Sequence, residues 1–189
     1  MRIVSGLWRG RKLAASKDDR IRPTADRTRE ALFNILAHGG EYRTEHGPLP
    51  QGVTVLDAFA GTGALGLEAL SRGAAHVTFL DQHAEAIRLI RQNLATLDAA
   101  DRATLVQRDA TLPGRAAQAC RLALLDAPYR SGLAPTALAA LTRQGWLAPD
   151  AIAIVELETK EDLAPVEGFE ILDERRYGKA KLVFLRRIT

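Results

Sequence analysis

Two kinds of hydrophobic spacing alternate along this chain, and their order predicts an α/β fold. Between short apolar runs typical of buried strands, apolar residues recur at helical spacing. Because strands that alternate with helices pair in parallel, we expect a mostly parallel sheet with helices on both faces. The predicted strands cover residues 53–57, 77–81, 103–109, 122–126, 152–157, 169–172 and 180–185, and the predicted helices cover residues 63–73, 83–97 and 133–143.

The N-terminal part of the chain precedes this alternation. Residues 1–13, interrupted by Ser5-Gly6, predict a short β-hairpin, and residues 20–36 predict a helix that opens with Pro23 and the N-cap candidate Thr24.

The length of the chain fits one domain. The 189 residues, 47% of them hydrophobic, suffice for a substantial core. We interpret residues 1–38 as an extension, the polar, turn-rich residues 39–52 as a linker, and residues 53–189 as the catalytic core.

Four predicted strands end in an aspartate: Asp57, Asp81, Asp109 and Asp126. Ligands of open parallel sheets bind at the carboxyl ends of the strands, so these carboxylates should line one cleft. Asp is also a good helix N-cap after any strand, and each of the four taken alone could be no more than that. Four in succession favour a cleft.

A glycine-rich turn follows the first of these strands. Gly61, Gly63 and Gly66 match the G-x-G-x-x-G pattern of dinucleotide sites, and Asp81 lies 20 residues beyond Gly61. Asp57, however, precedes Gly61 by only four residues, where its charge opposes a pyrophosphate.

S-adenosylmethionine, which carries an ammonium and a sulfonium centre, suits such a site better than an anionic cofactor. Asp57 would attract its amino-acid end, and Asp81 would accept hydrogen bonds from its ribose. The alternative is a turn that binds nothing. The expected cofactor-binding residues are Asp57, Phe59, Gly61, Thr62, Gly63, Asp81, Gln82, Asp109 and Ala110.

Positive charge is concentrated at the N-terminus. Residues 1–36 hold nine Arg or Lys against four Asp or Glu, a net +5, so the other residues sum to −2 within the total of +3. This asymmetry suggests a polyanion held beside the cleft. Edge-strand protection in the hairpin, or salt bridges along a solvated helix, would account for the same charges without a polyanion. The residues expected to contact such a polyanion are Arg9, Arg11, Lys12, Arg22, Thr24, Arg29 and Arg130.

Other features restrict the class of protein. No segment approaches eighteen uninterrupted apolar residues, and the first ten residues lack the apolar core of a signal peptide, so we expect a cytoplasmic protein without membrane contact. The single cysteine, Cys120, excludes an internal disulfide, and no histidine forms a ligand-spaced pair with it. We therefore expect no metal and interpret Cys120 as a small core residue.

The segment Asp126-Ala-Pro-Tyr129 leaves the fourth strand directly into the expected cleft. It resembles the Asp/Asn-Pro-Pro-Tyr/Phe loop of methyltransferases that modify exocyclic amino groups of bases. A carboxylate and a backbone carbonyl there can each accept one N–H of the amino group and aim its lone pair at the methyl group. The candidates are Asp126 and the carbonyl of Ala127 or Pro128, with Tyr129 stacking on the base. An ordinary turn is the alternative.

Over nearly its full length the chain resembles the RsmD-type 16S ribosomal RNA guanine-N2 methyltransferases of bacteria. The segments that carry the resemblance are Trp8-Arg-Gly-Arg-Lys-Leu13, Arg22-Pro-Thr-Ala-Asp-Arg-Thr-Arg-Glu-Ala-Leu-Phe-Asn34, Leu56-Asp-Ala-Phe-Ala-Gly-Thr-Gly-Ala-Leu-Gly-Leu-Glu-Ala-Leu-Ser-Arg-Gly73 and Asp126-Ala-Pro-Tyr129.

This resemblance implies a seven-stranded Rossmann-like class I methyltransferase sheet, S-adenosylmethionine as cofactor, and methylation of one guanine amino group in small-subunit rRNA. The expected partner is 16S rRNA or a small-subunit assembly intermediate, with the protein as a monomer. The chain departs from the family at Ala127, where the first proline of the loop usually stands. The expected consequence is a less stiff loop.

Three different functions compete with this one. An NAD-dependent oxidoreductase would need the pyrophosphate that Asp57 disfavours. A non-catalytic RNA-binding assembly protein would explain the basic N-terminus but not the set of strand-end carboxylates. Another nucleic-acid amino-group methyltransferase would use the same loop.

Overall fold

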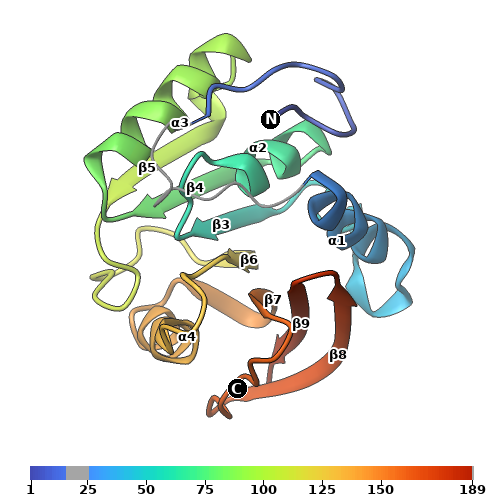
Figure 1. Ribbon diagram of the computed structural model, residues 1–189, viewed down its shortest axis with the longest axis vertical. Helices are drawn as coiled ribbons and strands as arrows, with labels where there is room; N and C mark the ends of the chain where they lie inside the picture. The colour runs from blue at the N-terminus through green and yellow to red at the C-terminus, as the bar shows by residue number, and fades with distance from the viewer. Residues whose placement is uncertain (16–25, 189) are drawn as a thin grey trace.

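The computed structural model describes residues 1–15 and 26–188, and its centre is a seven-stranded sheet (Figure 1). The strand order is β5-β4-β3-β6-β7-β9-β8. Strand β9 is antiparallel to both of its neighbours, β7 and β8, whereas β7 is parallel to β6. The strands are β3 (Thr54–Ala58), β4 (His76–Asp81), β5 (Ala103–Gln107), β6 (Cys120–Leu125), β7 (Leu147–Glu158), β8 (Phe169–Tyr177) and β9 (Ala180–Arg187). The expected Rossmann-like, mostly parallel sheet is confirmed.

Helices cover both faces of the sheet, as expected. Alternate strand residues face opposite sides: Val55 of β3 packs in the hydrophobic cluster of one face, and Leu56 packs in the cluster of the other. The first cluster contains residues of α1 (Asp26–His38), α2 (Ala64–Ser71) and α3 (Ala84–Thr96), whereas the second contains the apolar side of α4 (Leu133–Arg143).

Strand order reverses between β3 and β6, which are adjacent and parallel although the chain turns outward in opposite directions from them. Such a switch point opens a crevice at the carboxyl ends of the strands because the connecting loops part there. The four strand-end aspartates were expected at this edge of the sheet.

The segment 39–52 is more ordered than the predicted linker. It holds the 3-10 helix η1 (Gly40–Tyr42) and a small antiparallel pair, β1 (Arg43–Thr44) with β2 (Gly47–Pro48). Another 3-10 turn, η2 (Ala100–Arg102), precedes β5. Tyr42 is buried against Phe184 of β9, with ring centroids 5.5 Å apart. This segment therefore belongs to the packed body of the protein.

Residues 1–15, which we call the N-terminal strap, form the predicted hairpin only in a short, irregular version. They contain one antiparallel bridge, Arg2 with Lys12, and no regular strand. The strap packs along α2, and a Cβ on Gly6 would lie 2.0 Å from the carbonyl oxygen of Ser71. The two arms of the strap pair with each other, since the Ile3 amide donates to the Arg11 carbonyl at 2.9 Å. The tip also contacts the end of α2, where the Leu7 amide donates to the Ser71 carbonyl at 2.8 Å.

Two further expectations concern the core and the membrane. Cys120 is buried at the start of β6, as predicted, and burial raises the pKa of its thiol to about 12. In the portion of the chain that the structure describes, no helix combines the length and the apolar character needed to cross a membrane.

Candidate active site

A cavity of about 280 Å³ lies at the carboxyl edge of the sheet, on the loops that follow β3, β4, β5 and β6. The structure brings ten of the predicted site residues to its walls: Phe59, Gly61, Asp81, Gln82, Asp109, Ala110, Asp126, Ala127, Pro128 and Tyr129. Leu80, His83 and Leu133 complete the lining. The predicted cofactor loop and the predicted catalytic loop therefore face one chamber.

The charge of this cavity is negative. Asp81, Asp109 and Asp126 line it, and among the described residues no Lys or Arg does. A pyrophosphate would enter without a cationic partner and against three carboxylates. A ligand with positive centres is favoured on the same grounds.

The turn after β3 is held in an unusual conformation. Phe59 adopts a φ of 59°, in the left-handed region that non-glycine residues rarely occupy, and Gly61 adopts a φ of 56°. The amide of Gly61 donates a hydrogen bond to Asp81 Oδ2 at 2.9 Å. This bond joins the turn to the end of β4, so two walls of the cavity are connected directly.

The other oxygen of Asp81 is held by His83. Asp81 Oδ1 accepts from the amide of His83 at 2.9 Å and lies 3.0 Å from its ring Nδ1. His83 was predicted only as the start of a helix. The relevant signal is its position two residues after a strand-end aspartate, which is the spacing of an Asx-type turn.

Asp57 lies deeper than predicted. It is 1% exposed and does not line the main cavity, but it lines a small adjoining cavity together with Phe59, Thr62 and Asp126. Its Oδ2 accepts from the amide of Gly66 at 2.8 Å. Burial raises the pKa of Asp57 well above its ordinary value, and the charges of Asp126 and Asp81 add to the rise, against the lowering effect of the Gly66 amide.

Gly63 and Gly66 serve close packing rather than the cavity wall. A Cβ on Gly63 would lie 2.9 Å from Ile90 Cγ1, and one on Gly66 would lie 2.3 Å from Phe79 Cε1. The three glycines of the pattern thus divide into one at the cavity and two that let α2 lie directly on its neighbours. Gly63, predicted to bind the cofactor, lines neither the main nor the small cavity.

The loop after β6 is fixed by contacts from several elements. The hydroxyl of Tyr129 donates to Glu156 Oε1 of β7 at 2.7 Å, and Glu156 is 6% exposed. The carbonyl of Pro128 accepts from the Ser131 amide at 3.3 Å and from its hydroxyl at 2.5 Å. These contacts restrain the loop even though Ala127 stands where the family usually has a proline.

Arg130 is exposed and ion-paired. Its φ is 58°, its guanidinium pairs with Glu158, and its amide donates to Glu161 Oε1 at 2.7 Å. The predicted role in RNA binding would compete with the ion pair to Glu158.

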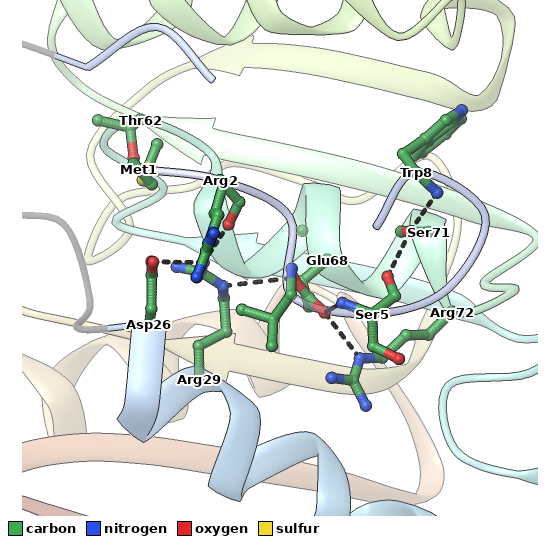
Figure 2. A network of polar contacts seen from close by, with 12 residues as sticks. Met1, Arg2, Ser5, Trp8, Asp26, Arg29, Thr62, Glu68, Ser71 and Arg72 are labelled. Carbon is green, nitrogen blue, oxygen red and sulfur yellow. Dashed lines mark hydrogen bonds and ion pairs between the residues drawn. The ribbon is translucent and has the colours of Figure 1, made fainter. Parts of the chain in front are cut away.

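The predicted RNA contact of Arg29 is wrong. Arg29 is fully buried. Its Nη2 donates to Asp26 Oδ1 at 2.8 Å and to the carbonyl of Arg2 at 2.6 Å (Figure 2). Its Nε donates to Glu68 Oε2 at 3.4 Å, and Glu68 is also fully buried. Arg29 faces the protein because this carboxylate of α2 lies beneath α1, so no phosphate reaches it.

The remaining predicted RNA-binding residues differ in place. Arg9, Arg11 and Lys12 are exposed on the strap. The tip of the strap is fixed at the far end of α2, where the Trp8 amide donates to Ser71 Oγ at 3.0 Å. Because α2 spans about 12 Å from its start at the glycine turn, Arg9 lies away from the cavity. Arg22 and Thr24 lie outside the described residues.

Comparison with known proteins agrees with this geometry. A family model described as "Conserved hypothetical protein 95" matches residues 1–186. The chain is 35% identical to the ribosomal RNA small subunit methyltransferase D of Haemophilus influenzae, over 94% of this chain and 89% of that protein. It is 37% identical to the Escherichia coli protein of the same name, over 88% of this chain and 79% of that protein.

A solved structure described as a putative methyltransferase from Escherichia coli superposes with a TM-score of 0.84. The two are 36% identical, and the match covers 100% of this chain and 98% of the other. Both the sequence and the fold comparisons thus extend over almost the whole chain, and they confirm the expected resemblance. The chain belongs to the conserved hypothetical protein 95 family, the RsmD family of ribosomal RNA methyltransferases.

Proposed function

We propose that this protein transfers a methyl group from S-adenosylmethionine to the exocyclic N2 amino group of a guanine in 16S rRNA. One observation carries the proposal: the Gly61–Asp81 wall and the Asp126–Tyr129 loop face a single negatively charged cavity. A cofactor site and an amino-group acceptor site are thereby within reach of each other. The names of the relatives support small-subunit rRNA as the substrate.

The residues of the cavity fit this methyl donor. Asp81 stands at the end of β4, where its carboxylate would accept hydrogen bonds from ribose hydroxyls, and Asp109 stands on the next loop. Asp57, in the adjoining small cavity, would face the positively charged amino-acid end. When bound, S-adenosylmethionine supplies a methyl group on a positively charged sulfur.

The loop after β6 would hold the amino group that receives the methyl group. A carboxylate oxygen of Asp126 accepts one N–H of the guanine amino group. The Pro128 carbonyl already accepts two hydrogen bonds from Ser131, so we assign the second acceptor to the carbonyl of Ala127. These two acceptors orient the nitrogen lone pair toward the methyl carbon.

The reaction requires one proton to leave. The amino nitrogen gains the methyl group and loses a proton, while the electrons of the broken carbon–sulfur bond remain on sulfur. Asp126 is the proposed proton acceptor because its carboxylate already contacts that N–H. Tyr129, oriented by Glu156, stacks against the base, which must first be turned out of its helix.

Nucleoside analysis tests this function. Small-subunit 16S rRNA lacking the modification is incubated with the purified protein and S-adenosylmethionine, digested, and analysed by mass spectrometry. We expect N2-methylguanosine at one site. Methylation of another base or another guanine atom would refute the assignment, and calorimetric binding of NADH instead of S-adenosylmethionine would refute the methyltransferase chemistry itself.

A further inference from the structure

A second hollow adjoins the active-site cavity. It has a volume of about 690 Å³ and lies between α1 and the turn that joins β8 to β9. Tyr129 lines both this groove and the cavity. A ligand that reaches the catalytic loop therefore has this groove immediately beside it.

Basic side chains surround the groove. Arg27 of α1, Arg176 of β8 and Lys179 of the turn line it, and all three are exposed. None of these three cations forms an ion pair with another residue in the described part of the chain. Glu30 and Glu156 also line the groove, so the cations exceed the carboxylates by one, and Glu156 accepts the hydroxyl of Tyr129.

Two aromatic rings complete the groove. Tyr129 and Tyr177 line it from different elements, and the amide side chain of Asn34 is present on α1. Grooves that bind single-stranded nucleic acid combine cations, which contact the phosphate backbone, with aromatic rings, on which the bases stack. The active-site cavity differs sharply because its lining is acidic.

The turn that carries Lys179 is fixed in place. Tyr177 pairs with Ala180 across it, the Thr159 amide donates to the Lys179 carbonyl at 2.9 Å, and the Thr159 hydroxyl donates to the Gly178 carbonyl at 2.8 Å. These bonds fix the backbone of the turn, so the Lys179 side chain starts from a defined place beside the groove, from which it can reach a phosphate.

We infer that this groove binds the single-stranded rRNA nucleotides that flank the methylated guanine. The inference rests on the proposed function, because a guanine held by the Asp126 loop must be turned out of its helix and leaves neighbouring nucleotides at the mouth of the cavity. Tyr129 lies between the target base in the cavity and the flanking nucleotide in the groove. Arg27, Arg176 and Lys179 contact phosphates, and Tyr177 stacks on a flanking base.

The test compares three triple variants in binding a single-stranded, guanine-containing oligoribonucleotide, followed by fluorescence anisotropy over a range of salt concentrations. The groove variant carries Arg27→Gln, Arg176→Gln and Lys179→Gln. A matched control removes three exposed cations elsewhere: Arg91→Gln, Arg115→Gln and Arg143→Gln. The third variant carries Arg9→Gln, Arg11→Gln and Lys12→Gln in the strap. Thermal unfolding checks that each variant folds.

We expect the groove variant to reduce the slope of log affinity against log salt by about two, because each single-strand phosphate contact contributes roughly 0.7. The matched control should retain the wild-type slope. Separately, Tyr177→Ala should weaken binding about ten-fold with an unchanged slope, and Tyr177→Phe should retain the affinity.

Two results would overturn the inference. A groove variant with the wild-type slope, or with no greater loss than the control, places the RNA elsewhere, and a loss confined to the strap variant places it on the strap. Methyl transfer to 16S rRNA by the wild-type protein, measured in parallel, separates the two proposals. If the wild type methylates guanine and the groove variant still binds normally, the groove assignment alone fails, whereas a wild type that neither methylates nor binds RNA refutes both.

Discussion

Replacement of Glu68 by alanine should release the N-terminal strap from the body of the protein. The fully buried carboxylate of Glu68 accepts hydrogen bonds from the amides of Val4 and Ser5, each at 2.9 Å. It also accepts from Arg72 Nε at 2.9 Å and from Arg29 Nε at 3.4 Å (Figure 2). One side chain of α2 thus joins the strap, α1 and its own helix.

The loss of unfolding free energy in Glu68→Ala can be estimated from the contacts that remain after the substitution. Arg29 keeps Asp26 and the Arg2 carbonyl as partners, so its charge is still partly compensated. The amides of Val4 and Ser5 lose a charged acceptor, each worth about 1.5–3 kcal/mol. Removing one partner of a buried ion pair costs about 3–5 kcal/mol, and we expect a loss in that range. That is a large part of a typical unfolding free energy of about 5–15 kcal/mol.

Urea unfolding measures the free energy, and amide hydrogen exchange at Val4 and Ser5 reports release of the strap. Glu85→Ala on α3 is the matched control, because Glu85 makes an ion pair with Arg88 that is exposed to solvent. The control should change the free energy of unfolding far less. A loss below about 1 kcal/mol for Glu68→Ala, or unchanged exchange in the strap, would refute the proposed role of this buried network.

Three further predictions concern the site. Since burial raises the pKa of Asp57, its favourable contribution to folding is present at low pH and is lost as pH rises through the raised pKa. Asp57→Asn should therefore gain stability relative to wild type as the pH is raised above the ordinary range of a carboxyl group, measured by denaturant unfolding, and a pH-independent difference would contradict this. In single-turnover methyl transfer, Tyr129→Phe keeps a stacking ring but loses its bond to Glu156, so we expect roughly a ten-fold loss, clearly smaller than for Tyr129→Ala; equal losses would exclude stacking. Gly66→Ala places a methyl group 2.3 Å from Phe79 Cε1, so it should destabilise the protein by about 1–3 kcal/mol in thermal unfolding, and an unchanged melting temperature would show that α2 moves freely.

Local patterns predicted the secondary structure because each element buries one regular face. The helix expected over residues 133–143 coincides with α4, whose apolar residues recur at helical spacing. The predicted strand at 152–157 was too short, since β7 begins at Leu147. Its first part contains Pro149 and Asp150, the latter with a φ of 56°, and such residues are not expected inside a strand. The structure accommodates them by a register shift between β7 and β6.

The cavity was predictable for the same reason that the sheet was. Parallel strands place their carboxyl ends at one edge, so aspartates at successive strand ends had to converge. Depth was not predictable: Asp57 and Asp81 occupy equivalent positions in the pattern, yet only Asp81 lines the main cavity. The difference follows from the strand register: β3 continues to Ala58, and Asp57 pairs with Phe79, two residues before Asp81 at the end of β4.

The location of the basic residues required the tertiary structure. Arg27 and Arg29 are two residues apart on one helix, but Arg27 is exposed at the groove and Arg29 is buried on Glu68. Glu68 lies 39 residues further along the chain, so no local pattern links it to Arg29. The basic groove likewise joins α1 to a turn near the C-terminus, a pairing that charge counted along the sequence cannot show.

The central claim is that Asp81 binds the cofactor and Asp126 acts in methyl transfer, although both line the same cavity. A paired measurement of two variants tests it most directly. S-adenosylmethionine affinity by calorimetry and single-turnover methyl transfer to 16S rRNA at saturating cofactor are measured for Asp81→Ala and Asp126→Ala. We predict that Asp81→Ala weakens cofactor affinity, whereas Asp126→Ala leaves affinity near that of wild type and slows transfer by about 10²-fold or more. A wild-type transfer rate in Asp126→Ala, or wild-type affinity in a folded Asp81→Ala protein, would contradict the account.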